Sequence, residues 1–156
     1  MSSHPPREEW PVPAPQSDAG TVLTDVILET FRLNARLLEV AQGFAAHGEM
    51  TAAWWQVLGG VIDEPRSVAD VGRRMGVTRQ SVQRIADVLV ERGLAEYRPN
   101  PAHRRAKLLA CTEAGYWAIR RTSIAQHPWA ERVAGEIGVE ALRQALATMR
   151  ALNESA

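Results

Sequence analysis

The chain of 156 residues carries no formal net charge at pH 7, and 46% of its residues are hydrophobic while 23% are charged. This length and apolar content suit one domain with a buried core and exclude a protein that binds nucleic acid through bulk charge alone. The single cysteine cannot form an internal disulfide, and neither a secretory signal nor an apolar run of ~18 residues is present. We therefore expect a cytoplasmic protein that does not cross a membrane.

The N-terminal segment 1–20 has five prolines before Gln16. Because proline stiffens a chain and removes backbone donors, this segment is predicted to be an extended arm. Trp10 is a large apolar residue within the arm, and two interpretations stay open. Either it belongs to a flexible tail, or it docks on the chain's own dimer or on a partner chain.

A long helix is predicted from Leu23 to about Ala46. Apolar residues cover roughly two of its faces, with Leu23 and Ile27 on the principal stripe. A helix with this much apolar surface needs cover on more than one side. One face can pack on its own domain, so the other is expected to meet a second subunit.

Two shorter helical patterns then meet at a tight turn at Gly76. The first runs from Val68 to Met75, and Gly76 supplies the backbone freedom that the end of a helix requires. Thr78 is a good N-cap for the second helix, which Gly93 closes. One face of this helix is apolar, and we expect that the polar groups at its start contact DNA: Thr78, Arg79, Gln80, Ser81, Gln83 and Arg84. A merely solvated polar face is the alternative, but no carboxylate appears before Asp87.

A short hairpin is predicted after Gly93. The segment 94–98 alternates apolar and polar residues, and 106–111 can pair with it. Two prolines fix a protruding turn between them, and its tip is rich in basic residues that suit a narrow minor groove. The expected DNA contacts of this wing are His103, Arg104, Arg105 and Lys107. The alternative is a hairpin tip that its charges merely keep soluble.

The distribution of charge supports a nucleic-acid partner. Residues 66–107 hold ten Lys or Arg and four Asp or Glu, whereas the rest of the chain holds eight and fourteen. Positive charge is therefore concentrated on the segment expected to face the duplex.

The C-terminal part is predicted to be helical. Thr112 caps one helix, which Pro128 is expected to kink or interrupt. After Gly138 a last helix carries an apolar stripe at nearly regular spacing. This stripe and that of the first helix exceed what a small lobe can bury, so they predict a symmetric homodimer. The residues expected at the subunit interface are Leu23, Ile27, Leu142, Leu146 and Met149.

The run from Thr51 to Gly115 resembles the MarR family of bacterial transcription regulators. The matching segments are TAAWWQVL, SVADVGRRMGVTRQSVQRIADVLVERGLAEYRPNP and RRAKLLACTEAG. The resemblance implies a mainly α winged helix-turn-helix of the α+β type, with a three-helix DNA-binding lobe and a hairpin wing at 49–112 and a helical dimerisation region at 21–48 and 113–156. It also implies a repressor that binds a palindromic operator as a homodimer and is released by a small molecule. Two positions depart from the family, since His103 replaces the usual Asp of the wing and Cys111 the usual Leu.

The ligand site is less defined. The resemblance implies that aromatic ligands bind near Trp54 and Trp55, and we take these residues and His47 as candidate lining. Alternatively, the two tryptophans are core aromatics, one in each lobe. His47, Glu49 and His127 lack the spacing of a metal site, so neither a metal nor another cofactor is expected.

Other functional classes are less favoured. The sequence has no nucleophile elbow, phosphate loop or metal cluster, so it does not predict an enzyme. A winged helix used only for protein–protein contact is an alternative, although this chain keeps a basic wing and a polar recognition face. A redox-responsive regulator using Cys111 is a further alternative, but a buried and inert thiol is favoured there.

Overall fold

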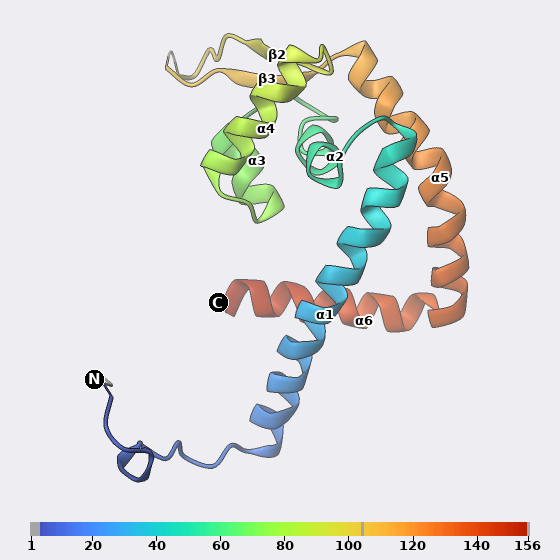
Figure 1. The fold of residues 1–156 in the computed structure, drawn as a ribbon. Coiled ribbons are helices and arrows are strands. Elements are labelled where there is room, and N and C mark those ends of the chain that lie inside the picture. The colour runs from blue at the N-terminus through green and yellow to red at the C-terminus, as the bar shows by residue number, and fades with distance from the viewer. Residues whose placement is uncertain (1–3, 104, 156) are drawn as a thin grey trace. The chain divides into compact units, whose positions relative to one another are not determined.

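The computed structural model describes residues 4–103 and 105–155. The chain divides into two compact units, one up to Leu37 and one from Leu38 onward. The structure is mainly helical with one small sheet, which confirms the predicted fold class (Figure 1). Its elements are the 3-10 helix Arg7–Glu9, α1 (Asp18–His47), α2 (Ala52–Gly59), β1 (Arg66–Ser67), α3 (Val68–Met75), α4 (Arg79–Glu91), β2 (Ala95–Arg98), β3 (Leu108–Cys111), α5 (Glu113–Ile137) and α6 (Val139–Ser155).

The N-terminal unit contains the proline-rich arm and the first turns of α1. Helix α1 begins at Asp18, so the last three residues of the predicted arm are helical. The cause is local, because the Ser17 hydroxyl accepts a hydrogen bond from the backbone N–H of Gly20 at 3.2 Å, as an N-cap does. Within the arm, the Trp10 indole donates to the carbonyl of Pro5 at 3.0 Å.

The core of the second unit lies between α2, α3, α4 and the sheet. Gly76 has a φ of +64° and ends α3, while Ser67 and Thr78 cap α3 and α4 through their hydroxyls. The predicted bounds of α3 are therefore correct to the residue. The fully buried side chains of this core are Val57, Leu58, Val61, Val71, Val82, Ala86, Leu89 and Leu109.

The sheet has three antiparallel strands in the order β1–β3–β2, so the wing is more than the predicted hairpin. The added strand β1 pairs Arg66 with Leu109, and Tyr97 faces the same residue from β2. Both hairpin strands are shorter than predicted. Strand β3 starts only at Leu108, because the N–H of Ala106 donates to the carbonyl of His103 and not to a strand.

The base of the wing is joined to the start of α5 by Thr112. Its hydroxyl accepts from the backbone N–H of Gly115 at 3.2 Å and donates to the carbonyl of Gly93 at 2.7 Å. Gly115 leaves no room for a side chain, since a Cβ there would lie 2.1 Å from the carbonyl oxygen of Leu94. The wing and α5 are thus in close backbone contact.

Helix α5 continues through Pro128 as one helix, so the predicted interruption does not occur. Beyond the proline, Trp129 contacts Phe44 at the end of α1, with ring centroids 5.6 Å apart. Helix α6 follows Gly138 and has no buried residue, and α1 has only Ala45 buried.

Candidate nucleic-acid interface

The start of α4 presents a polar surface beside its cap. The Thr78 hydroxyl accepts from the N–H of Ser81 at 3.2 Å and also donates to the Ser81 hydroxyl at 3.0 Å. These two predicted contact residues are therefore engaged in capping the helix. A shallow hollow of about 560 Å³ on the outer side of α4 is lined by Arg79, Gln80, Gln83, Arg84 and Asp87.

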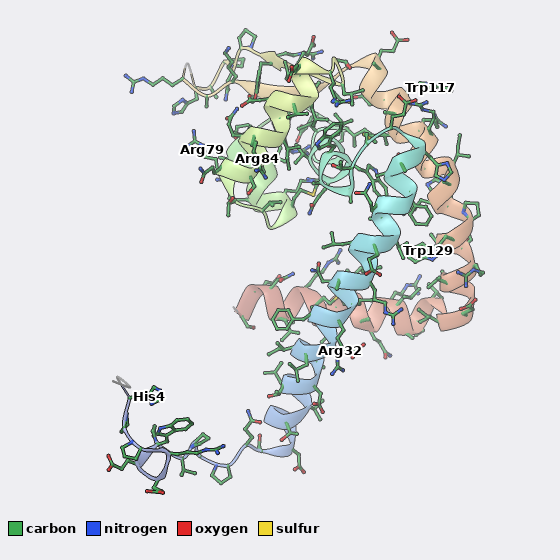
Figure 2. The ribbon with its side chains drawn as sticks, viewed as in Figure 1. His4, Arg32, Arg79, Arg84, Trp117 and Trp129 are labelled. Carbon is green, nitrogen blue, oxygen red and sulfur yellow. The ribbon has the colours of Figure 1, made fainter. Side chains whose placement is uncertain are left out.

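The arginines of α4 are exposed. Arg79 and Arg84 project from the helix in Figure 2, and among the described residues neither takes part in an ion pair. Most of the other basic side chains of the lobe are neutralised locally. Arg73 pairs with Asp70, and Arg98 pairs with Glu96 at 2.6 Å.

A second hollow of about 540 Å³ separates α4 from the wing. Arg79, Gln83 and Asp87 line its helix side, and its wing side includes Tyr97, His103, Arg105 and Lys107. Arg105 and Lys107 are exposed, and the Lys107 ammonium lies 5.8 Å from the centre of the Tyr97 ring. Cations from two separate elements thus flank one groove.

The wing tip is an ordered turn on the side that the structure describes. The Asn100 side-chain oxygen accepts from the N–H of Ala102 at 3.0 Å, and the Asn100 carbonyl accepts from the N–H of His103 at 3.2 Å. His103 is thereby held at the mouth of the groove. Arg104, also predicted to contact DNA, lies outside the described residues.

Three polar side chains link α4 to the wing. The Gln83 amide nitrogen donates to Asp87 Oδ1 at 2.9 Å and to the Tyr97 hydroxyl oxygen at 2.7 Å. The Tyr97 hydroxyl in turn donates to Asp87 Oδ1 at 2.7 Å. Burial and the neighbouring Asp87 carboxylate raise the pKa of Tyr97 to about 12, so this phenol stays protonated and keeps donating.

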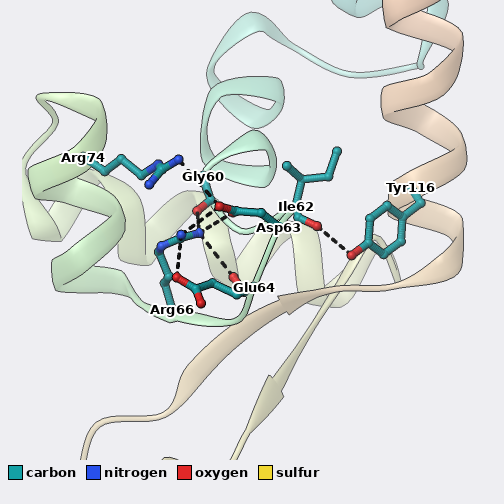
Figure 3. A network of polar contacts seen from close by, with 7 residues as sticks. All are labelled: Gly60, Ile62, Asp63, Glu64, Arg66, Arg74 and Tyr116. Atoms are coloured by element: carbon teal, nitrogen blue, oxygen red, sulfur yellow. Dashed lines mark hydrogen bonds and ion pairs between the residues drawn. The ribbon is translucent and has the colours of Figure 1, made fainter.

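An arginine network braces the lobe below this surface (Figure 3). Arg66 donates to the carbonyl of Gly60 at 2.9 Å and forms ion pairs with Asp63 and Glu64. The hydrogen bond from Arg66 holds the pKa of the Asp63 carboxyl well below its usual range. Tyr116 of α5 closes the same loop by donating to the carbonyl of Ile62 at 2.7 Å.

Comparison with known proteins shows which family this arrangement resembles. Residues 49–106 match the model of the MarR family. Over these residues the chain resembles MarR-family proteins, in agreement with its winged helix-turn-helix.

Relatives and solved structures are similar over a longer part of the chain. Uncharacterized proteins of Mycobacterium tuberculosis and Mycobacterium bovis are 44% identical over 90 residues, which make up 58% of this chain, and the chain spans about 63% of their length. The fold is similar to that of CouR from Rhodococcus jostii RHA1 bound to p-coumaroyl-CoA, with a TM-score of 0.73 and 21% identity over 82% of this chain and 91% of that one. It is also similar to the transcriptional regulator BldR from Sulfolobus solfataricus, with a TM-score of 0.71 and 17% identity over 89% and 97% of the two chains.

The candidate lining residues of a ligand pocket, Trp54, Trp55 and His47, do not line either of the two hollows beside α4. Trp54 and Trp55 are half-buried against the core, and the Arg92 guanidinium lies 4.6 Å from the centre of the Trp54 ring. His47 is exposed at the end of α1. A hollow of about 330 Å³ lies instead beside α5, lined by Ile62, Tyr116, Ile119, Arg120, Ser123, Ile124 and His127. No periodic pattern could have indicated this set of residues, because Ile62 belongs to a loop that is distant in the chain.

Cys111 lies at the end of β3 as a buried, free thiol. Burial raises its pKa to about 11, so the thiolate needed for reaction with an oxidant is scarce at neutral pH. This environment disfavours the redox-sensing alternative.

In residues 4–103 and 105–155, no group of three or more His, Cys, Asp or Glu side chains could hold a metal ion. No helix in these ranges is both long and apolar enough to span a membrane.

Proposed function

We propose that this chain is a MarR-family transcription regulator of the cytoplasm, which binds double-stranded DNA as a homodimer and represses from a palindromic operator. The observation that carries the proposal is the position of the cations without an ion-pair partner among the described residues of the lobe. Arg79 on α4 and Arg105 and Lys107 on the wing line one groove, and Arg84 lines the outer hollow of α4 together with Arg79.

This arrangement suits a duplex. The first turns of α4 would enter the major groove, where arginine and glutamine side chains reach base edges. The wing would reach the adjacent minor groove, where a guanidinium is attracted by the strong negative potential. The groove between them would then receive the phosphate backbone that separates the major from the minor groove.

Dimer formation is proposed from uncovered apolar surface. Leu142, Leu146 and Met149 form an exposed stripe on α6, and Leu23 and Ile27 are exposed on α1. Large exposed apolar residues at regular spacing on both terminal helices suit a second copy of the chain. A twofold dimer would present two copies of α4 to the two halves of a palindrome.

Release by a small molecule is proposed for the hollow beside α5. Its lining combines apolar Ile62 and Ile119 with polar Tyr116, Arg120 and His127, which suits an aromatic molecule with an acidic group. CouR, which shares the fold, was solved bound to p-coumaroyl-CoA. Binding there would stress the contact between Tyr116 and the carbonyl of Ile62, and so the loop that precedes β1.

Selection of bound sequences from a random duplex pool tests the proposal. We expect an enriched palindrome. Its affinity should fall by roughly tenfold or more between 50 and 200 mM salt, because releasing counterions from the duplex gains less entropy at higher salt. Arg84→Ala should cost about 1–3 kcal/mol of binding to that palindrome and relax base preference. Arg132→Ala is the matched control, because it removes the same charge from an exposed position on α5.

Two results would contradict the proposal. Absence of any enriched sequence, with no binding to random duplex even at low salt, would favour the winged helix as a protein–protein module. If Arg84→Ala weakened selected and random duplexes equally, Arg84 would be a phosphate contact and not a reader of bases.

A further inference from the structure

The orientation of the Gln83 amide is fixed by its two partners. A carboxylate can only accept hydrogen bonds, so the group that faces Asp87 Oδ1 at 2.9 Å must be the NH2 of Gln83. The Tyr97 hydroxyl uses its single proton on Asp87, at 2.7 Å, so toward Gln83 its oxygen accepts. Both hydrogen bonds of Gln83 therefore start from its NH2 group, which is directed at the protein.

Because the NH2 group of Gln83 is engaged within the protein, its carbonyl oxygen is the group that it can present to DNA. An unrestrained glutamine can recognise adenine with two bonds, by accepting from N6 and donating to N7. Here the donor half is held against Asp87 and Tyr97, and the carbonyl oxygen lies on the other side of the amide. Gln83 remains accessible, since it lines both the outer hollow of α4 and the groove beside the wing.

We infer that Asp87 and Tyr97 act as positioning residues that make Gln83 a pure hydrogen-bond acceptor toward DNA, so that it selects a base with an exocyclic amine. This inference rests on the proposed DNA-binding function. In the major groove the amines are N6 of adenine and N4 of cytosine, whereas guanine and thymine present carbonyl oxygens at the corresponding places. An oxygen of Gln83 is attracted by the first pair and repelled by the second.

The chemistry also predicts what Gln83 does not do. Since its NH2 group is engaged within the protein, it does not use the donor that would distinguish adenine from cytosine through N7. One operator position should therefore accept adenine and cytosine almost equally and reject guanine and thymine. Such a pattern differs from that of a free glutamine, which favours adenine alone.

The test compares variants of the full chain on duplexes that carry each of the four base pairs at every half-site position. For the wild type we expect one position with a preference of about tenfold for adenine or cytosine over guanine or thymine. Gln83→Leu should abolish that preference while the other positions keep theirs. Asp87→Asn should make binding to the four bases at this position nearly equal. An asparagine amide can donate to the Gln83 carbonyl, so the Gln83 amide can rotate and present either its NH2 group or its oxygen to DNA.

Two further variants keep the result interpretable. Tyr97→Phe removes one partner while keeping the ring, and we expect it to lower the preference by a few-fold, less than Asp87→Asn does. Glu91→Gln removes one negative charge from the same helix without touching the three-residue cluster, and it should leave the preference unchanged. Thermal unfolding of each variant verifies that it is folded before its base preference is scored.

The outcomes separate the inference from the proposal beneath it. A preference that survives Gln83→Leu shows that Gln83 does not read this base. A preference that is lost in Gln83→Leu and intact in both Asp87→Asn and Tyr97→Phe overturns the positioning role alone. Absence of binding to any duplex by the wild type overturns the proposed function, and the inference with it.

Discussion

Helices α4 and α6 have similar apolar periodicity in the sequence but different surroundings in the structure. In α4 the stripe of Val82, Ala86 and Leu89 is fully buried by other elements of the lobe. In α6 the corresponding stripe remains open, with Leu142 37% exposed and Leu146 48% exposed. Periodicity therefore predicts that a helix forms and which face is apolar, but it does not tell what covers that face.

The two helices also differ in how their apolar side chains contribute to stability. Burying a leucine side chain contributes roughly 1.5–3 kcal/mol. Helix α4 obtains this contribution from its own chain, so the winged helix is held by contacts within one copy. Helix α6 has yet to obtain it, and a second copy would supply the missing cover.

The largest expected effect comes from a substitution in the buried apolar stripe of α4. Leu89→Ala should lower the free energy of unfolding by about 2–5 kcal/mol, because it leaves a cavity among residues that have no exposed surface. Urea unfolding followed by circular dichroism measures the loss. The loss should not depend on protein concentration, since Leu89 is covered by its own chain. A loss below about 1 kcal/mol would mean that the core collapses around the alanine.

The substitution Leu146→Asp tests the exposed apolar stripe of α6. A carboxylate in the middle of the α6 stripe should oppose its burial against a second copy and shift the protein from dimer to monomer, with the dissociation constant raised by about a hundredfold, or roughly 2.7 kcal/mol. Light scattering coupled to size-exclusion chromatography measures the mass. Gln144→Asp is a matched control, because it adds the same charge to α6 outside the stripe. If the Leu146→Asp protein stayed a dimer at micromolar concentration, this stripe would not be at the interface.

The smallest effect concerns the arginine network that braces the lobe. The pKa of Asp63 is lowered in the folded state, so its ionised form adds stability above its unfolded pKa of about 3.9, and this stability is lost as the pH falls further. Asp63→Asn should lower the melting temperature near neutral pH. The difference from the wild type should shrink as the pH falls from about 5 to about 2. A difference independent of pH would show that the ion pair with Arg66 contributes nothing measurable.

Much of the winged helix is predictable from the sequence because its determinants are local. A glycine at positive φ ends α3, and a threonine hydroxyl caps α4, within a few residues of the bounds that they set. Strand β1 was missed for the opposite reason. Its two residues form a strand only because β3, some forty residues later in the chain, offers them a partner.

The candidate site divides in the same way. Arg79, Gln80 and Arg84 could be placed on an exposed face from helical spacing alone, and the pairing of Gln83 with Asp87 has the i, i+4 spacing that could have suggested it. The role of Tyr97 could not, because it depends on how the wing folds back on α4. The hollow beside α5 escaped prediction for the same reason, since it joins Ile62 to residues more than fifty positions later.

The junction at Thr112 has a mechanical consequence. Helix α5 contains 25 residues and therefore extends roughly 37 Å, at ~1.5 Å per residue. Its N-cap Thr112 donates to the carbonyls of Gly93 and Leu94, so the wing base and the helix start are coupled. A movement of the far end of α5 would therefore rotate the wing together with the helix. A shift of about 3 Å at its far end, near Ile137, corresponds to a turn of about 5° at the wing base for a helix of this length. Displacements comparable to the size of a methyl group at one end would thereby be converted into a change of angle at the other.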